Sequence, residues 1–335
     1  MNTRAIRADF FMLITAAIWG TAFVAQRVGM DYVGPFTFNG VRFLIGGLSL
    51  IPFLFIRPTK PGKVEAEAEI ETGAKAEVKE EVKAGEVGEG AGLGSRWKLL
   101  LYGALAGGAL YLGASFQQVG IVYTTAGNAG FITGLYVIMV PILGLVVGRR
   151  PGGGVWLGAV LAVIGMYLLN EAPGVGLNIG DALVLVCALF FALHVLLLGR
   201  ISPMFPAVPL SIIQFLTCAL LSLLTALWRE TIMFTDILAA AVPILYGGIG
   251  SVGIAYTLQV IAQKDAPPAH AAIILSLESV FALIGGVLLL GETVVALKIA
   301  GAGLMLAGML AAQVQRYFLN RKTRRAAAYE SADRL

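Results

Sequence analysis

Stretches of about 20 mostly apolar residues recur from one end of the chain to the other, and that length is what an α-helix needs to cross a lipid bilayer. Ten of them can be recognised, and they cover approximately residues 9–28, 35–56, 97–119, 127–147, 154–170, 181–200, 209–228, 237–261, 270–290 and 296–318. We therefore expect an all-α polytopic membrane protein with ten transmembrane helices. The start of the chain also has the basic and apolar regions of a signal peptide, but no small-residue cleavage site follows, so we expect this segment to remain as the first helix.

The composition agrees with a membrane protein and argues against other classes. Hydrophobic residues make up 58% of the 335 residues and charged residues make up 13%, whereas about a quarter of a soluble domain is charged. The net charge of +4 does not indicate nucleic-acid binding, because the charges lie between and beyond the apolar stretches. The partners we expect are the lipid bilayer and a small-molecule substrate.

The sequence contains no motif for a cofactor, a metal or a catalytic centre. A Walker motif for ATP is absent, as is the Gly-x-Ser-x-Gly elbow of hydrolases, so we expect neither an ATP-driven pump nor an enzyme. Cys187 and Cys218 lie inside apolar stretches, where cysteine behaves as a small hydrophobe. The two histidines and two cysteines lack metal-ligand spacing, so we expect no metal site.

Lys and Arg are distributed unevenly between the loops, and this predicts the orientation of the chain. If the N-terminus is cytoplasmic, the 24 Lys and Arg residues lie on the inner side except for Arg27, Arg229 and Lys298, and for Arg42, which lies within a span. By the positive-inside rule, we expect a multi-pass protein of the plasma (inner) membrane with both termini in the cytoplasm.

An insert between the second and third spans, residues 58–95, differs in composition from the rest of the chain. It is rich in Glu and Lys and almost free of large apolar side chains, so it cannot bury enough surface to fold alone. We expect a disordered cytoplasmic linker, with a regulatory or partner-binding segment as the alternative. Residues 319–335 are expected to form a basic cytoplasmic tail.

The two halves of the chain repeat each other. Five residues recur 143 positions later, since Gly148, Gly158, Leu161, Gly165 and Met166 match Gly291, Gly301, Leu304, Gly308 and Met309. Asp9 and Asp181 correspond at the start of each half with the larger offset of 172, and the insert between the second and third spans accounts for most of the difference. Five spans per repeat is an odd number, so the repeats, residues 1–170 and 171–318, must have opposite orientations in the membrane. Inverted repeats usually place a substrate site near the midplane, so we expect a central cavity between them.

Four segments carry motifs in a recognisable order. They are AAIWGTAFVAQR at 16–27, VRFLIGGL at 41–48, YTTAGNAGFITGLYVIMVPILG at 123–144 and LESVFALIGGVLLLGE at 277–292. In this order they resemble the EamA-like family of the drug/metabolite transporter superfamily. Two departures are Ser279, where the family often has proline, and Arg149, where it has the glutamate of a Gly-Glu pair, so no proline kink is expected at Ser279. The resemblance implies a ten-helix transporter of small metabolites or drugs and leaves the substrate open.

Polar residues inside the predicted spans are candidates for a substrate or coupling site. Glu278, flanked by Ser276, lies in span nine at a depth comparable to that of His194 in span six. An ionisable side chain at such depth is costly, so it is expected to face the protein interior. Gln259 and His270 are expected nearer the inner surface, and Glu278 or His194 is a candidate carrier of a coupling proton. The alternative for each is a polar contact between packed helices.

A second group of polar residues is expected at the outer end of the pathway. Gln117 and Gln118 end span three, and Asn128 begins span four. Inversion makes Gln118 the partner of Gln259, which suits matching polar linings on the two sides of one pathway. The alternative is that these amides cap helix ends at the lipid interface.

Two aromatic residues and one arginine complete the candidates. Trp19 and Tyr136 offer ring faces on which an apolar or cationic substrate could stack, with core packing as the alternative. Arg42 in span two is expected to be structural. Its side chain would either snorkel to the outer surface or pair with a carboxylate or a helix C-terminus.

These observations together favour a secondary transporter that works by alternating access. We expect an exporter of small organic metabolites, such as amino acids or drug-like compounds, across the cytoplasmic membrane. The alternatives are a membrane-embedded enzyme that uses Glu278 and His194, and a passive channel. We expect a monomer or a weak dimer, with proton coupling as a candidate driving force.

Overall fold

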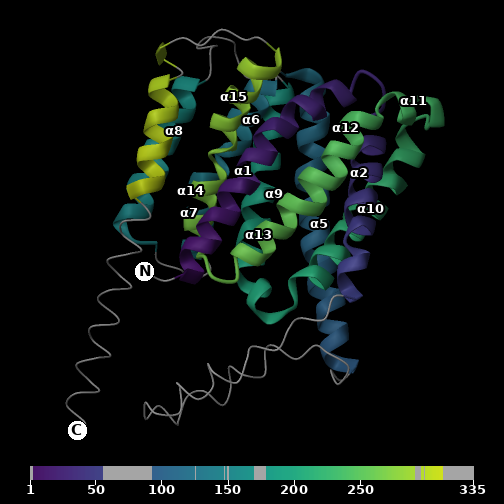
Figure 1. The fold of residues 1–335 in the computed structure, drawn as a ribbon, viewed down its shortest axis with the longest axis horizontal. Coiled ribbons are helices and arrows are strands. Elements are labelled where there is room, and N and C mark those ends of the chain that lie inside the picture. The colour runs from purple at the N-terminus through teal and green to yellow at the C-terminus, as the bar shows by residue number, and fades with distance from the viewer. Residues whose placement is uncertain are drawn as a thin grey trace.

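A computed structural model describes residues 3–55, 93–124, 126–146, 148, 151–169, 179–290, 296–297 and 299–311. The described chain forms a bundle of helices, with no strand in these ranges (Figure 1). The predicted insert at 58–95 lies outside the described residues up to position 92, and the predicted tail at 319–335 lies wholly outside them.

The first half of the chain supplies five membrane-spanning units. They are α1 (Thr3–Gly29), α2 (Pro35–Ser49) with the short 3₁₀ helix η1 (Ile51–Phe55), α5 (Leu93–Tyr123), the pair α6 (Ala126–Gly134) and α7 (Tyr136–Val146), and α8 (Gly153–Leu169). α2 begins at Pro35, whose missing N–H and restricted φ suit the first turn of a helix.

The second half supplies the corresponding five units. They are α9 (Ile179–Ile201) with η3 (Ser202–Met204), α10 (Ala207–Arg229), the run α11 (Phe234–Ala239), α12 (Ala241–Leu245), η4 (Tyr246–Tyr256) and α13 (Thr257–Ala262), the pair α14 (Pro268–Leu275) and α15 (Glu278–Leu290), and a last helix within 299–311.

This arrangement agrees with the ten predicted spans. Eight helical stretches are long and apolar enough to cross a bilayer, and two shorter apolar helices, Gly153–Gly165 and Ile299–Ala311, correspond to the predicted fifth and tenth spans. The short length of Gly153–Gly165 agrees with the sequence, in which the fifth apolar stretch is also short. The protein is therefore an all-α membrane protein with two five-span repeats.

Glycines of the repeat bring the two halves together with opposite orientation. A Cβ atom added to Gly165 would lie 2.5 Å from the carbonyl oxygen of Gly301, and one added to Gly308 would lie 2.7 Å from that of Gly158. The higher-numbered glycine of α8 thus meets the lower-numbered glycine of the last helix, so these two helices run antiparallel, side by side (Figure 1). This is the geometry that a two-fold axis in the membrane plane imposes on equivalent helices.

The fourth span of each repeat is broken near its middle. α6 ends at Gly134 and α7 begins at Tyr136, while α14 ends at Leu275 and α15 begins at Glu278. The two breaks occupy equivalent places, because the repeat offset of 143 relates Leu135 to Glu278. Discontinuous helices at equivalent places in inverted repeats are typical of the substrate sites of secondary transporters.

Tight turns, without a proline at the break, cause both interruptions. Leu135 N donates to Ile132 O at 3.1 Å, and Leu277 N donates to Ile274 O at 3.1 Å, so the backbone locally bonds three residues back. At the second break Ser276 Oγ donates to Ile273 O at 2.8 Å, which offers that carbonyl a partner outside the regular helical ladder. The break before Ser279 therefore needs no proline kink.

The eighth span contains a π-helix, η4, over Tyr246–Tyr256. Such segments are rare and often occur at functional sites. Two carbonyls of this segment accept hydrogen bonds from α1, since Trp19 Nε1 donates to Ser251 O at 3.2 Å and Thr15 Oγ1 donates to Ala255 O at 3.1 Å. Side chains of the first repeat therefore support the unusual backbone of the second.

Candidate functional site

A cavity lies inside the bundle between the two repeats, and it encloses about 500 Å³ of space between atoms, its opening included. Its walls come from α1, α2, α5, α6 and α7 of the first repeat and from α9, η4, α13, α14 and α15 of the second. The lining residues are Trp19, Ala22, Phe23, Gln26, Arg42, Gln117, Thr133, Tyr136, Phe191, His194, Val195, Ser251, Tyr256, Gln259, Leu275 and Glu278.

In each broken span, the second helical segment begins at this cavity. Tyr136 begins α7 and Glu278 begins α15, and both line the space. The two side chains lie within electrostatic reach of each other. Glu278 is only 3% exposed, and its Oε1 atom has no hydrogen-bond partner within the described part of the chain. A helix N-terminus favours a nearby negative charge, and the break at Ser276 creates one at this carboxyl.

His194 enters the cavity from α9 and is 1% exposed. Its Nε2 atom lies 3.0 Å from Gln214 Oε1 of α10. Because an amide oxygen accepts, Nε2 donates in this contact, and Nδ1 is then the acceptor nitrogen. The imidazole also meets the ring of Tyr256 edge-on, with centroids 6.1 Å apart.

Arg42 also lines the cavity, from α2, and is 3% exposed. Its guanidinium carbon lies 5.3 Å from the ring centroid of Phe38 and 5.1 Å from that of Phe43, distances at which a cation is attracted to a ring face. No carboxylate pairs with Arg42 among the described residues, and its Nε atom has no hydrogen-bond partner there. The side chain therefore lies inside the protein without a counter-ion.

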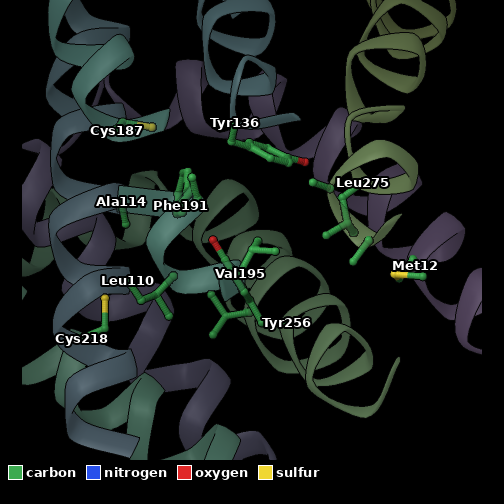
Figure 2. Close-up of a cluster of buried hydrophobic side chains, with 14 of the residues drawn as sticks. Met12, Leu110, Ala114, Tyr136, Cys187, Phe191, Val195, Cys218, Tyr256 and Leu275 are labelled. Carbon is green, nitrogen blue, oxygen red and sulfur yellow. The ribbon is translucent and has the colours of Figure 1, made fainter. Parts of the chain in front are cut away.

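Aromatic side chains form much of the remaining wall. The rings of Trp19 and Tyr256 lie 4.5 Å apart between centroids, and Figure 2 shows Tyr136, Phe191 and Tyr256 extending from three different helices around one interior region. Aromatic rings with a few placed polar groups are the usual lining of a small-molecule site.

The predicted amide residues occupy different places. Gln117 lines the cavity and donates from Nε2 to Thr133 Oγ1 at 3.1 Å. Gln259 lines it as well, and its Oε1 atom lacks a partner among the described residues. Gln118 lies outside the lining, where its Nε2 donates to Gln26 O at 3.2 Å. The side chain of Asn128 lies outside the described residues.

His270 and Ser276 are buried but do not line the cavity. His270 lies at the start of α14, where its Nε2 is 2.9 Å from Asp9 Oδ1 of α1. Ser276 lies within the break and bonds to its own helix. No group of three or more His, Cys, Asp or Glu side chains that could hold a metal ion occurs in the described ranges.

Comparisons with known proteins agree with this architecture. The model of the EamA-like transporter family matches residues 6–171 and again residues 178–312, one match for each repeat. The chain belongs to the EamA-like transporter family. It is 31% identical over 317 residues to an uncharacterized transporter of Archaeoglobus fulgidus, with 92% of this chain and 86% of the relative covered. It is 25% identical over 305 residues to the uncharacterized transporter YwfM of Bacillus subtilis, with 90% and 92% covered.

The fold also agrees with a solved structure. A protein crystal structure superimposes with a TM-score of 0.68 at 18% identity, and the match covers 93% of this chain and 98% of that one. The resemblance predicted from the motifs is confirmed by the family match, and the protein is a multi-pass membrane transporter.

Opposite ends of this EamA-like transporter are tied by equivalent aspartates. Asp9 of α1 pairs with His270 at the start of α14. Asp181 of α9 accepts a hydrogen bond from Thr124 Oγ1, just before α6, at 2.6 Å. Each aspartate lies near the start of the first helix of its own repeat. Asp9 reaches the fourth span of the other repeat, and Asp181 reaches the residue just before it. We refer to Asp9–His270 and Asp181–Thr124 as the two end contacts.

Sequence reasoning missed several residues that line the cavity of this transporter, notably Tyr256, Phe191 and Ser251. Phe191 and Tyr256 are aromatic residues within apolar spans, and nothing in the sequence pattern distinguishes them from residues of the hydrophobic core. Tyr256 lies in the segment AYTLQV at 255–260, whose likeness to ASFQQV at 114–119 marks the repeat, and this was the one available signal.

Proposed function

We propose that this transporter is a secondary carrier that moves small organic molecules by alternating access through the central cavity. The observation that carries this proposal is that both repeats contribute to one buried cavity, at the point where the fourth span of each is broken. Broken helices leave backbone groups and side chains available to a solute at the midplane of a bilayer. A shared cavity can change its accessible side when one repeat rocks against the other.

The end contacts fit such a rocking motion. Asp9–His270 joins α1 to α14 at one end of the bundle, and Asp181–Thr124 joins α9 to the start of α6 at the other. Both contacts join one repeat to the other, so opening the cavity at either end requires breaking the contact there. We propose that they act as gates which open in turn.

We further propose that Glu278 carries a coupling proton. It is the acidic residue of the cavity lining, and it is buried without a cationic partner in the described chain. A carboxyl that gains and loses a proton with the accessible side would link transport to the proton gradient. The positive-inside rule supports both termini in the cytoplasm. We propose export across the plasma (inner) membrane as the direction, and the resemblance to drug/metabolite transporters is what suggests it.

Counterflow in liposomes tests the carrier mechanism. The purified protein is reconstituted, loaded with an unlabelled solute from a panel of metabolites, and presented with trace labelled solute outside. A carrier accumulates the label transiently through trans-stimulation, and protein-free liposomes serve as the control. Label that equilibrates without trans-stimulation would identify a channel, and label recovered as a different compound would identify an enzyme.

A further inference from the structure

The charge inside the cavity is unbalanced, and Arg42 is the reason. Its guanidinium remains protonated in proteins, and its carbon lies over the rings of Phe38 and Phe43, at 5.3 and 5.1 Å from their centroids. Isolated charges are normally buried only with a partner of opposite sign. Arg42 has none among the described residues, and it lines the central cavity.

Glu278 does not supply the missing charge. It forms no ion pair with Arg42, and Tyr256 lies within electrostatic reach of both side chains. The other titratable groups within reach of Glu278 are Tyr136 of α7 and Cys187 of α9, and His194 of α9 shares the cavity. The helix α1 contributes no charged side chain to the lining, and neither does α6.

None of these neighbours is a carboxylate or an amine that would hold Glu278 ionised. The N-terminus of α15 favours a negative charge on Glu278 only modestly, whereas burying a carboxylate without a partner of opposite charge is more costly, so we treat Glu278 as the neutral acid in this conformation. The cavity then holds one net positive charge, on Arg42, and one O–H donor, on Glu278.

From this we infer that the substrate is an organic monocarboxylate, held by Arg42 through its carboxylate and by the aromatic wall through an apolar body. One guanidinium balances one negative charge, and its planar fork matches the two oxygens of a carboxylate. A phosphate monoester would bring almost two charges and leave one unbalanced. The rings of Trp19, Tyr136 and Phe191 supply the surface for the apolar part.

This inference rests on the proposed carrier function and adds a consequence for coupling. A negative substrate beside Arg42 raises the cost of ionising Glu278, so the anion and the proton occupy the cavity together. Transport of a monocarboxylate would carry one proton and no net charge when Glu278 releases its proton in the conformation through which the empty carrier returns.

A matched series of probes tests the substrate class. 3-Phenylpropionate, phenylalanine, 3-phenylpropanamide and phenethylamine share one body and differ as an anion, a zwitterion, a neutral molecule and a cation. The same four charge forms are prepared with indolyl, cyclohexyl and branched alkyl bodies. Binding to the purified protein is measured by calorimetry, and transport is measured by counterflow. We expect the carboxylates to bind at least about tenfold more tightly than the amides of the same body.

Variants of the two charged residues sharpen the test. Arg42→Gln is expected to lose about tenfold or more in carboxylate affinity, and Arg42→Lys about half of that loss on a logarithmic scale, because it keeps the charge without the planar fork. Arg229→Gln removes an exposed arginine that stacks on Trp228 at 4.3 Å and is the matched control. Thermal unfolding of each variant shows whether it is folded, and the probe series on the unsubstituted protein keeps the test valid if the Arg42 variants fail to fold.

Several results would overturn the assignment. Preference for the amine, the amide or the zwitterion in every body would do so, as would unchanged carboxylate affinity in a folded Arg42→Gln protein. Absence of binding by every carboxylate would also overturn it. If solutes of another charge class show counterflow, the carrier function stands and the monocarboxylate assignment alone fails.

Discussion

Glu278 differs in chemistry from its counterpart in the first repeat. The repeat offset of 143 relates it to Leu135, so one broken helix carries a carboxyl and its counterpart carries an alkyl side chain. The first residue of the helix that follows each break lines the cavity, Tyr136 in one repeat and Glu278 in the other. The two breaks thus have nearly symmetric positions, and a carboxyl group is present at only one of them.

Replacing Glu278 by Gln is expected to remove the pH dependence of transport. The amide has the same shape and cannot take up or release a proton, so a proton-coupled step through this position is lost while the cavity keeps its volume. Counterflow measured from pH 5 to 9 checks this, with Asp236→Asn at the end of the bundle as a control carboxylate. A Glu278→Gln profile that follows the wild-type pH dependence would contradict the coupling role.

A tight contact between α1 and α15 predicts a stability effect at Gly20. A Cβ atom there would lie 2.6 Å from Phe281 Cβ and 2.7 Å from Ala282 N, both rigid parts of α15. Gly20→Ala should therefore lower the free energy of unfolding by about 1–3 kcal/mol. Gly108→Ala is the matched control, because a Cβ at Gly108 meets no atom within 4 Å and alanine favours the helix.

Thermal unfolding in detergent compares the two glycine variants. Equal melting temperatures for Gly20→Ala and Gly108→Ala would mean that α1 does not pack on α15 as closely as described.

At the scale of helices, the pattern of the sequence predicted most of the fold. Ten apolar stretches correspond to the ten spans, because a bilayer demands a minimum apolar length that hydropathy measures directly. The shared cavity residues Glu278 and His194 were predictable for a related reason, since a buried ionisable group in a span stands out against an apolar background.

Other features of the helices depend on tertiary contacts and left no local signal. The breaks at Leu135 and Ser276 arise from tight backbone turns, and no proline marks the second. The π-helix η4 is supported by hydrogen bonds from Trp19 and Thr15, which lie more than 200 residues away in sequence. The absence of a counter-ion for Arg42 likewise became visible only once its neighbours were placed.

Glu230 illustrates a contact between helices that can be tested. It follows α10, and its carboxylate accepts hydrogen bonds from Phe36 N and Thr37 N at 2.8 Å each, capping the first turn of α2. Glu230→Gln removes the charge and one acceptor oxygen, so the free energy of unfolding should fall by about 1–2 kcal/mol. Asp236→Asn in the exposed helix α11 is the comparison, and equal stability of the two variants would argue against this cap.

The whole molecule is a pair of repeats related by a two-fold axis, and its topology follows from that. Ten spans would place both termini on one side, and the excess of Lys and Arg expected there predicts that this side is the cytoplasm. A reporter that is active only in the cytoplasm should show activity when it is fused to the N-terminus and also when it is fused to the C-terminus. Activity of a periplasmic reporter at either end would contradict this orientation.

The two end contacts give the most direct test of alternating access through the central cavity. Paired cysteines at Asp9 and His270, or at Asp181 and Thr124, are introduced in a Cys187→Ala/Cys218→Ala background and joined by a short thiol-reactive crosslinker that a reductant can cleave. Counterflow is then measured before crosslinking, after it, and after reduction. We predict that either crosslink alone abolishes counterflow and that reduction restores it; full counterflow through the crosslinked protein would contradict the account.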